Sequence, residues 1–111
     1  MPIHQELSRG RWRTLSLVEQ LGNVGSEVGR AVKRQQEGNA DSFQKSFDRS
    51  LELLDFTIAD PRWRKTPKLK EIVRSREVLC DFFFGGNRYN STAESLERYF
   101  FQFAVAARLS R

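Results

Sequence analysis

Both tryptophans of the chain sit inside the same tripeptide, Arg-Trp-Arg, at residues 11–13 and again at residues 62–64. A guanidinium can bind phosphate oxygens through paired hydrogen bonds, and a flat indole can stack on an unpaired base. Two lysines follow the second tripeptide. A site for single-stranded or looped RNA needs these residue types together, because cations neutralise phosphates. We predict a nucleic-acid-binding set of Arg11, Trp12, Arg13, Arg62, Trp63, Arg64, Lys65 and Lys68.

The same tripeptides allow a structural interpretation. Two tryptophans can cover the open end of a hydrophobic core while their arginine neighbours extend toward solvent. Cations near the C-terminus of a helix also interact favourably with its dipole. Both interpretations stay open at this point, and one set of residues could serve both.

Composition restricts the classes of partner and compartment. The 111 residues carry a net charge of +5, which favours a polyanion such as nucleic acid or an anionic membrane face. The single cysteine, Cys80, excludes an internal disulfide and is typical of a reducing compartment. No apolar segment approaches the ~20 residues that span a bilayer, and residues 1–10 contain no apolar signal-peptide core. We therefore expect a cytoplasmic protein that does not enter a membrane.

Four helices are expected to position these residues, because apolar side chains recur at helical spacing from residue 16 onward. The four helix starts are indicated, in order, by Ser16 with Glu19, Asp41 with Gln44, Thr66-Pro67, and Ser91 with Glu94. The first three helices are expected to stop at Gly38-Asn39, Asp60-Pro61 and Gly85-Gly86-Asn87. Short loops between helices of similar length favour an all-α, up-down-up-down antiparallel four-helix bundle over residues 16–111. Residues 1–15, polar and basic without a clean period, are expected to form a basic N-terminal arm. This topology would bring both tripeptides, with Arg108 and Arg111, to one end.

Some small and apolar residues fall outside the expected core stripes. Three glycines form one flank of the first helix, and four large apolar residues lie opposite the stripes of the third and fourth helices. These positions favour an interface with a partner helix or a second subunit. Alternatively, the glycines make room for phenylalanines of the same bundle, and the apolar residues are ordinary surface residues. The interface set is Gly22, Gly25, Gly29, Val78, Phe82, Phe101 and Val105.

Arg76 falls in the centre of the third stripe, between Val73 and Leu79. A guanidinium that faces a core needs a carboxylate partner or several carbonyls. We expect either a buried structural ion pair or an anion-binding centre inside the bundle. The candidate partners are Glu27, Asp48 and Asp55.

The residue patterns of enzymes and metalloproteins are missing. His4 is the only histidine, no Cys/His spacing suits zinc, and no Glu-x-x-His pair suits a di-iron bundle. The glycines at 85–86 lack the lysine and serine of a phosphate-binding loop, and no Arg-x4–6-His pair of HEPN-type ribonucleases occurs. We expect a non-enzymatic protein without metal or cofactor.

Four segments resemble a group of small helical proteins, described as hypothetical, from bacterial genomes and metagenomes: SLVEQLGNVGSEVGRA, SLELLDFTIADPRW, LKEIVRSREVLCDFFFGGN and YNSTAESLERYFFQFAVAAR. The resemblance spans residues 15–108 and implies no activity, cofactor or site residue. In shape alone, the expected fold is similar to the bundles of the ribosomal-RNA intervening-sequence family and the accessory variability proteins of diversity-generating retroelements. That resemblance implies a ring-forming basic bundle that binds nucleic acid or a reverse transcriptase.

The sequence therefore predicts a non-enzymatic accessory protein that binds nucleic acid, RNA in particular, through a basic end of the bundle that contains both tryptophans. The alternative is a protein–protein adaptor or an oligomeric scaffold, in which the positive charge is incidental.

Overall fold

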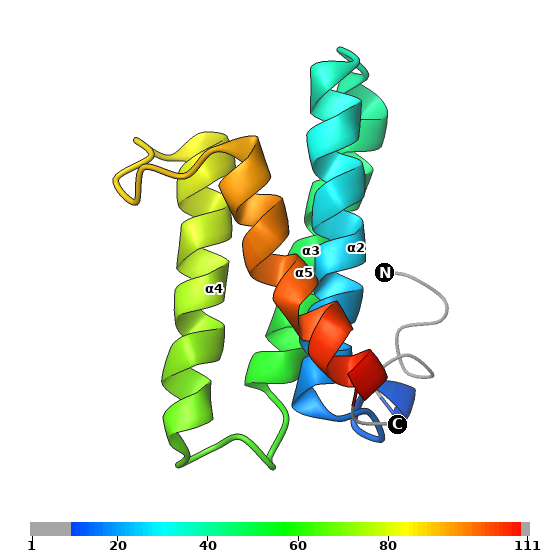
Figure 1. The fold of residues 1–111 in the computed structure, drawn as a ribbon, viewed down its shortest axis with the longest axis vertical. Coiled ribbons are helices and arrows are strands. Elements are labelled where there is room, and N and C mark those ends of the chain that lie inside the picture. The colour runs from blue at the N-terminus through cyan, green and yellow to red at the C-terminus, as the bar shows by residue number, and fades with distance from the viewer. Residues whose placement is uncertain (1–9, 110–111) are drawn as a thin grey trace.

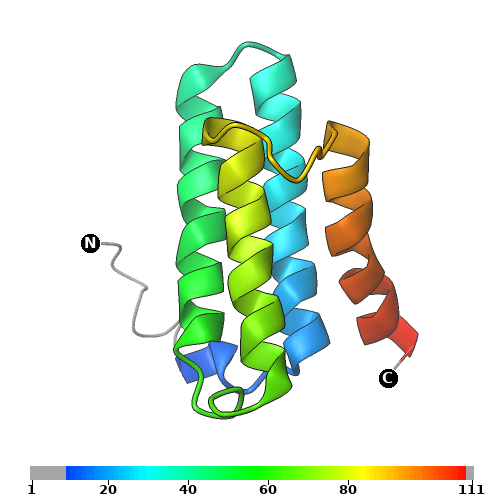
Figure 2. The same ribbon diagram turned by 90° about the vertical axis from the view of Figure 1, so that its left-hand side faces the viewer.

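The computed structural model describes residues 10–109, and this part of the chain is helical without strands. The long helices are α2 (Leu17–Gln36), α3 (Ala40–Ile58), α4 (Pro67–Phe84) and α5 (Ala93–Leu109), and residues 10–12 are also helical. Figures 1 and 2 show α2, α3 and α4 side by side with alternating chain direction. In Figure 1, α5 runs obliquely from the upper end of α4 to the lower end of α2. The all-α class is confirmed.

Local capping signals place some helix starts correctly and others a few residues off. The capping box at α2 is confirmed, because Glu19 N donates to Ser16 Oγ (3.2 Å) and Ser16 N donates to Glu19 Oε1 (3.0 Å). Helix α3 begins earlier than Asp41 predicts, since Asn39 Oδ1 accepts from Ser42 N. At α5 the reciprocal hydrogen bonds join Thr92 and Ser95 rather than Ser91 and Glu94. Capping oxygens on residues one or two positions away explain both shifts.

Helix α2 packs closely on α5, and this contact explains two of the three glycines. A Cβ atom on Gly25 would lie 2.8 Å from Cβ of Phe100, and one on Gly22 would lie 3.2 Å from Cα of Ala104. Gly22 and Gly25 therefore serve packing within the chain, as the alternative interpretation holds. Gly29 differs, because a Cβ there would meet nothing within 4 Å.

Phenylalanine rings form the contact between α3 and α4. Phe43 and Phe47 of α3 meet Phe83 and Phe84 of α4, with ring centroids 5.2 Å apart for Phe43–Phe83 and 4.8 Å for Phe47–Phe84. Such tilted and edge-on pairs are favourable aromatic geometries. Four of the nine phenylalanines thus fill the space between these two helices.

Helix α4 is rotated relative to the prediction. Its buried residues are Ile72, Ser75 and Leu79, whereas Val73 is exposed. Val78 and Phe82 are partly buried against the core, which contradicts the outward position predicted for them; their part in an interface stays a prediction. Phe101 and Val105 of α5 are exposed as predicted.

The same rotation moves Arg76 out of the core. Its side chain is 37% exposed, and Nε donates to Oδ1 of Asp55 at 2.9 Å. Asp55 was one of the three candidate partners, but it is itself more than half exposed. The expected buried pair is therefore a surface ion pair, which contributes little to stability, and the expected anion-binding centre inside the bundle is also wrong.

We predict opposite effects of adding one methyl group at two glycines of α2. Gly25→Ala forces its Cβ against Phe100 and should lower the free energy of unfolding by about 1–3 kcal/mol. The matched control Gly29→Ala enters open space and should raise it by up to about 1 kcal/mol, because alanine favours a helix over glycine. Urea denaturation measures both, and equal effects would contradict the close α2–α5 packing.

Candidate nucleic-acid interface

A buried glutamine brings the two Arg-Trp-Arg tripeptides together. Gln20 of α2 donates from Nε2 to the carbonyl of Trp12 at 2.8 Å and accepts at Oε1 from Trp63 Nε1 at 2.9 Å. Trp12 Nε1 in turn donates to Oγ1 of Thr57, near the end of α3, at 2.9 Å. The two tripeptides therefore lie side by side, at the lower end of the molecule in Figure 1.

Both indoles belong to the core. Trp12 is 6% exposed and Trp63 is 8% exposed. The Trp63 ring is also covered by the Arg62 guanidinium at 4.5 Å and the Lys68 ammonium at 5.2 Å from its centroid. The prediction that these tryptophans stack on bases is therefore wrong, and the structural interpretation describes them.

Arg62 is committed to a buried carboxylate. Its Nη2 donates to Asp60 Oδ2 at 2.7 Å and to the carbonyl of Leu15 at 2.6 Å, while its backbone N–H donates to Asp60 Oδ1 at 3.0 Å. The Asp60 side chain is fully buried and also accepts from Gln20 Nε2 at 3.1 Å. Arg62 thus joins the loop after α3 to the segment before α2, and its predicted phosphate contact is not supported.

The electrostatics of this pair follow from burial and hydrogen bonding. Burial raises the pKa of Asp60, but hydrogen bonds from the side chain and backbone of Arg62 and from Gln20 lower it more, to about 2. The hydrogen bond to Asp60 raises the pKa of Arg62. Both groups stay charged at neutral pH, so the pair is a structural element of this end.

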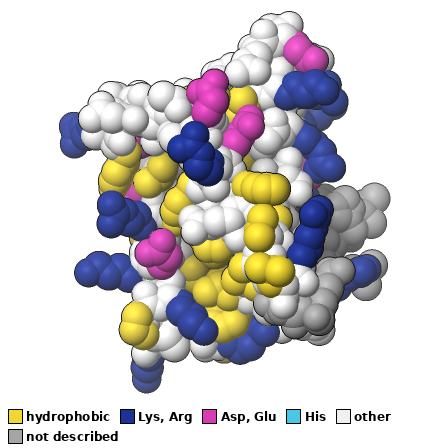
Figure 3. All heavy atoms as spheres, in the orientation of Figure 1, with side chains coloured by type: hydrophobic (Ala, Val, Ile, Leu, Met, Phe, Trp, Pro, Cys, Tyr) yellow, Lys and Arg dark blue, Asp and Glu magenta, His cyan; other side chains and the backbone are white. Residues whose placement is uncertain are grey.

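The remaining cations of the two tripeptides, and the two lysines that follow the second, face solvent. We define the basic pole as five exposed residues that form no ion pair with another described residue: Arg11, Arg13, Arg64, Lys65 and Lys68. Arg108 is exposed as well, and Arg111 lies outside the described residues. Figure 3 shows one face of the molecule in the orientation of Figure 1, and the charged side chains on its lower half are almost all lysine and arginine. The described part of the expected arm, residues 10–15, is docked through Trp12 rather than separate from the domain.

Sequence patterns did not reveal an exposed tyrosine, Tyr89, which shares a groove along α4 with Lys65 of the basic pole. A groove with a volume of about 580 Å³ lies along α4, and Lys65, Lys70, Val73, Arg74 and Tyr89 are among the residues that line it. Tyr89 is 44% exposed, with the Arg74 guanidinium 5.8 Å from its ring centroid. The spacing of Lys70 and Arg74 places both on one helix face. Tyr89 could not be placed, because its loop is held by Asp81, whose carboxylate accepts from the backbone N–H of Arg88 and Tyr89.

Comparisons with protein-family models, with curated proteins and with solved structures gave no significant match to this chain. Within residues 10–109, no cluster of three or more His, Cys, Asp or Glu side chains is placed to hold a metal ion. No helix in the same range is long and apolar enough to cross a membrane.

We predict that Trp63 stabilises the fold without any ligand. Trp63→Phe leaves the buried Oε1 of Gln20 without its donor and should lower the free energy of unfolding by about 1–3 kcal/mol. Trp63→Ala also leaves a cavity and should cost about 3–5 kcal/mol. Tyr89→Phe is the control, since it removes only an exposed hydroxyl that donates to Glu77. An unchanged melting temperature of the ligand-free Trp63→Ala variant would refute the core role.

We predict that Asp60 makes stability fall in acid. Its folded pKa is about 2 against an ordinary 3.8, so its contribution is complete above pH 3.8 and is lost as the pH falls toward 2. Over this window the wild type should lose roughly 2 kcal/mol more than Asp60→Asn, which cannot titrate. Urea denaturation at several pH values measures the difference, and parallel profiles would contradict it.

Proposed function

We propose that this chain is a non-enzymatic accessory protein that binds the phosphate backbone of RNA at one end of an up-down-up-down four-helix bundle. The observation that supports the proposal is the basic pole: five exposed cations, from two segments far apart in sequence, without a carboxylate partner among the described residues. Phosphate contacts of this kind supply affinity without sequence preference.

Rigid backbones favour this mode of binding. Trp12 and Trp63 are buried and hydrogen-bonded to the same glutamine, which fixes the chain on both sides of each indole. Arg11, Arg13 and Arg64 therefore project from anchored positions. A ligand would have to order their side chains but not their backbones, which lowers the entropic cost of binding.

The groove along α4 supports single-stranded RNA over a duplex. Tyr89 offers an exposed ring in the same groove as Lys65, Lys70 and Arg74, and base stacking on such a ring tolerates any sequence. Bases in a duplex are already stacked on each other and are not available to it. In this proposal Tyr89 takes the stacking role that the sequence assigned to the tryptophans.

A paired substitution tests the proposal. Arg13→Gln with Arg64→Gln removes two cations of the basic pole. Its control, Lys33→Gln with Lys45→Gln, removes two exposed cations near the junction of α2 and α3, at the other end of the bundle. Fluorescence anisotropy with a labelled single-stranded RNA should show about tenfold weaker binding for the first variant at about 50 mM salt. The control should bind nearly as the wild type does.

The salt dependence provides a second readout of the same experiment. Each lost phosphate contact should reduce the slope of log affinity against log salt concentration by about 0.7 for a single strand. The pole variant should therefore lose about 1.4 from its slope. Equal binding by both variants, or binding that does not weaken with salt, would rule out the basic pole as the site.

The alternative function, a protein–protein adaptor or oligomeric scaffold, is favoured by one observation. Phe101, Val105 and Leu109 are exposed together on α5. Apolar association of this kind would persist at salt concentrations that abolish phosphate binding.

A further inference from the structure

The exposed face of α5 carries a regular seam. Glu94, Phe101 and Arg108 follow each other at seven-residue spacing, so they drift by only about 20° per step around the helix. Phe101 is the central residue of α5 (Ala93–Leu109) and is 57% exposed. A large ring therefore marks the midpoint of the seam, with opposite charges about 10 Å away on either side.

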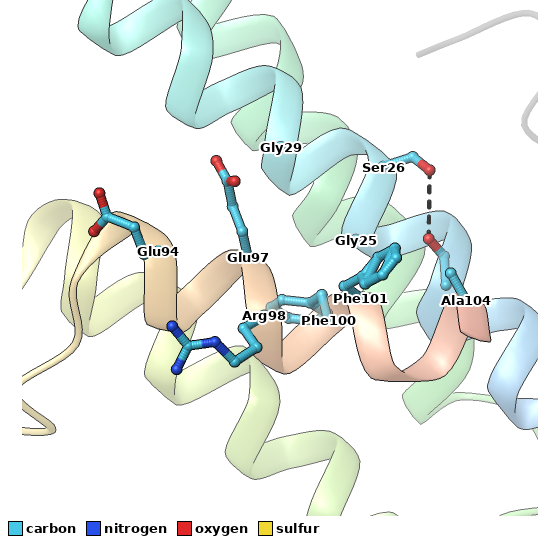
Figure 4. Close-up of a pocket in the computed structure, with 10 residues that line it drawn as sticks. Gly25, Ser26, Gly29, Glu94, Glu97, Arg98, Phe100, Phe101 and Ala104 are labelled. Atoms are coloured by element: carbon cyan, nitrogen blue, oxygen red, sulfur yellow. Dashed lines mark hydrogen bonds between the residues drawn. The ribbon is translucent and has the colours of Figure 1, made fainter. Parts of the chain in front are cut away.

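The seam borders an open groove between α2 and α5. The groove has a volume of about 480 Å³, and Gly25, Gly29, Glu97, Arg98 and Phe101 are among the residues that line it. Figure 4 shows it between the two helices, with the charged side chains of α5 on one side and the glycines of α2 on the other. A Cβ on Gly29 would meet nothing within 4 Å, so another helix can approach the α2 backbone there.

The charges along α5 form no ion pair with any other described residue. Within the described residues, no ion pair involves Glu94, Glu97, Arg98 or Arg108. Two carboxylates lie in the first part of the helix, and Arg108 lies in its last turn. The helix thus has an acidic beginning and a basic end.

The charges of one α5 helix are complementary to those of a second copy in the antiparallel orientation only. When two copies of α5 lie antiparallel with Phe101 opposite Phe101, residues equally far before and after it face each other. Glu94 of each copy then faces Arg108 of the other, which gives an ion pair at both ends. In a parallel arrangement, Glu94 faces Glu94 and Arg108 faces Arg108, and both pairs repel.

We propose that the α5 seam is a docking surface for a second copy of this chain, with the two α5 helices antiparallel about a two-fold axis near Phe101. Such an isologous contact buries the exposed Phe101 ring of both copies and pairs Glu94 with Arg108 at both ends. The proposal rests on α5 and its groove, and it stands independently of RNA binding at the basic pole.

Sedimentation of the full chain over a range of concentrations tests the dimer. The wild type should dimerise, and Phe101→Asp should raise the dissociation constant roughly 100-fold, since an apolar ring is lost from both copies. Val73→Asp, which alters an exposed apolar residue of α4, is the matched control and should change little. A wild type that stays monomeric, or a dimer that Phe101→Asp leaves intact, would overturn the proposal.

Charge reversal tests the orientation. Glu94→Arg and Arg108→Glu should each weaken the dimer about tenfold, because each places like charges together at both ends. The double variant restores opposite charges and should recover wild-type affinity, and a mixture of the two single variants should form heterodimers. A double variant as weak as the single variants, or single variants as tight as the wild type, would refute the antiparallel arrangement. RNA binding by Glu94→Arg is measured in parallel, so that the two proposals fail separately.

Discussion

The buried side-chain amide of Gln20 is the contact on which the end of the bundle depends. Its nitrogen donates to the Trp12 carbonyl and to the Asp60 carboxylate, and its oxygen accepts from the Trp63 indole. It therefore ties α2 to the segment before it and to the loop after α3. Because all of these groups are buried, removing one leaves others without partners, at a larger cost than the net value of one hydrogen bond.

Within each tripeptide, this network holds the tryptophan in the core and leaves its neighbours at the surface. The tryptophan faces inward, and its neighbours face solvent, except Arg62, which neutralises the buried Asp60. The repeated pattern is thus a structural anchor flanked by cations. Anchoring places positive charge from distant parts of the chain at one end, and this charge is the physical basis of the proposed contact with phosphates. The apolar face of α5 is a different surface, with its own charge pattern and its own proposed partner.

The sequence could predict what local signals determine, and it failed where distant partners decide. The box at Ser16 and the start of α4 at Pro67 were predictable from neighbouring residues. The rotation of α4 was not, because its buried Ser75 pairs with the hydroxyl of Tyr99 at 2.8 Å, and an apolar pattern does not reveal a polar core position. The tryptophans were correctly placed at one end, yet their burial depends on Gln20 and Thr57, which no spacing rule connects to them.

Hydrogen exchange at the two indole N–H groups, followed by NMR in the free protein, tests this account most directly. Trp12 and Trp63 each donate to a buried oxygen, so both indole protons should exchange only when this end of the fold opens. They should stay protected when single-stranded RNA is added. Exchange of either proton at the rate of a free indole would contradict the buried network. It would indicate that this tryptophan lies at the surface, where it could stack on a base.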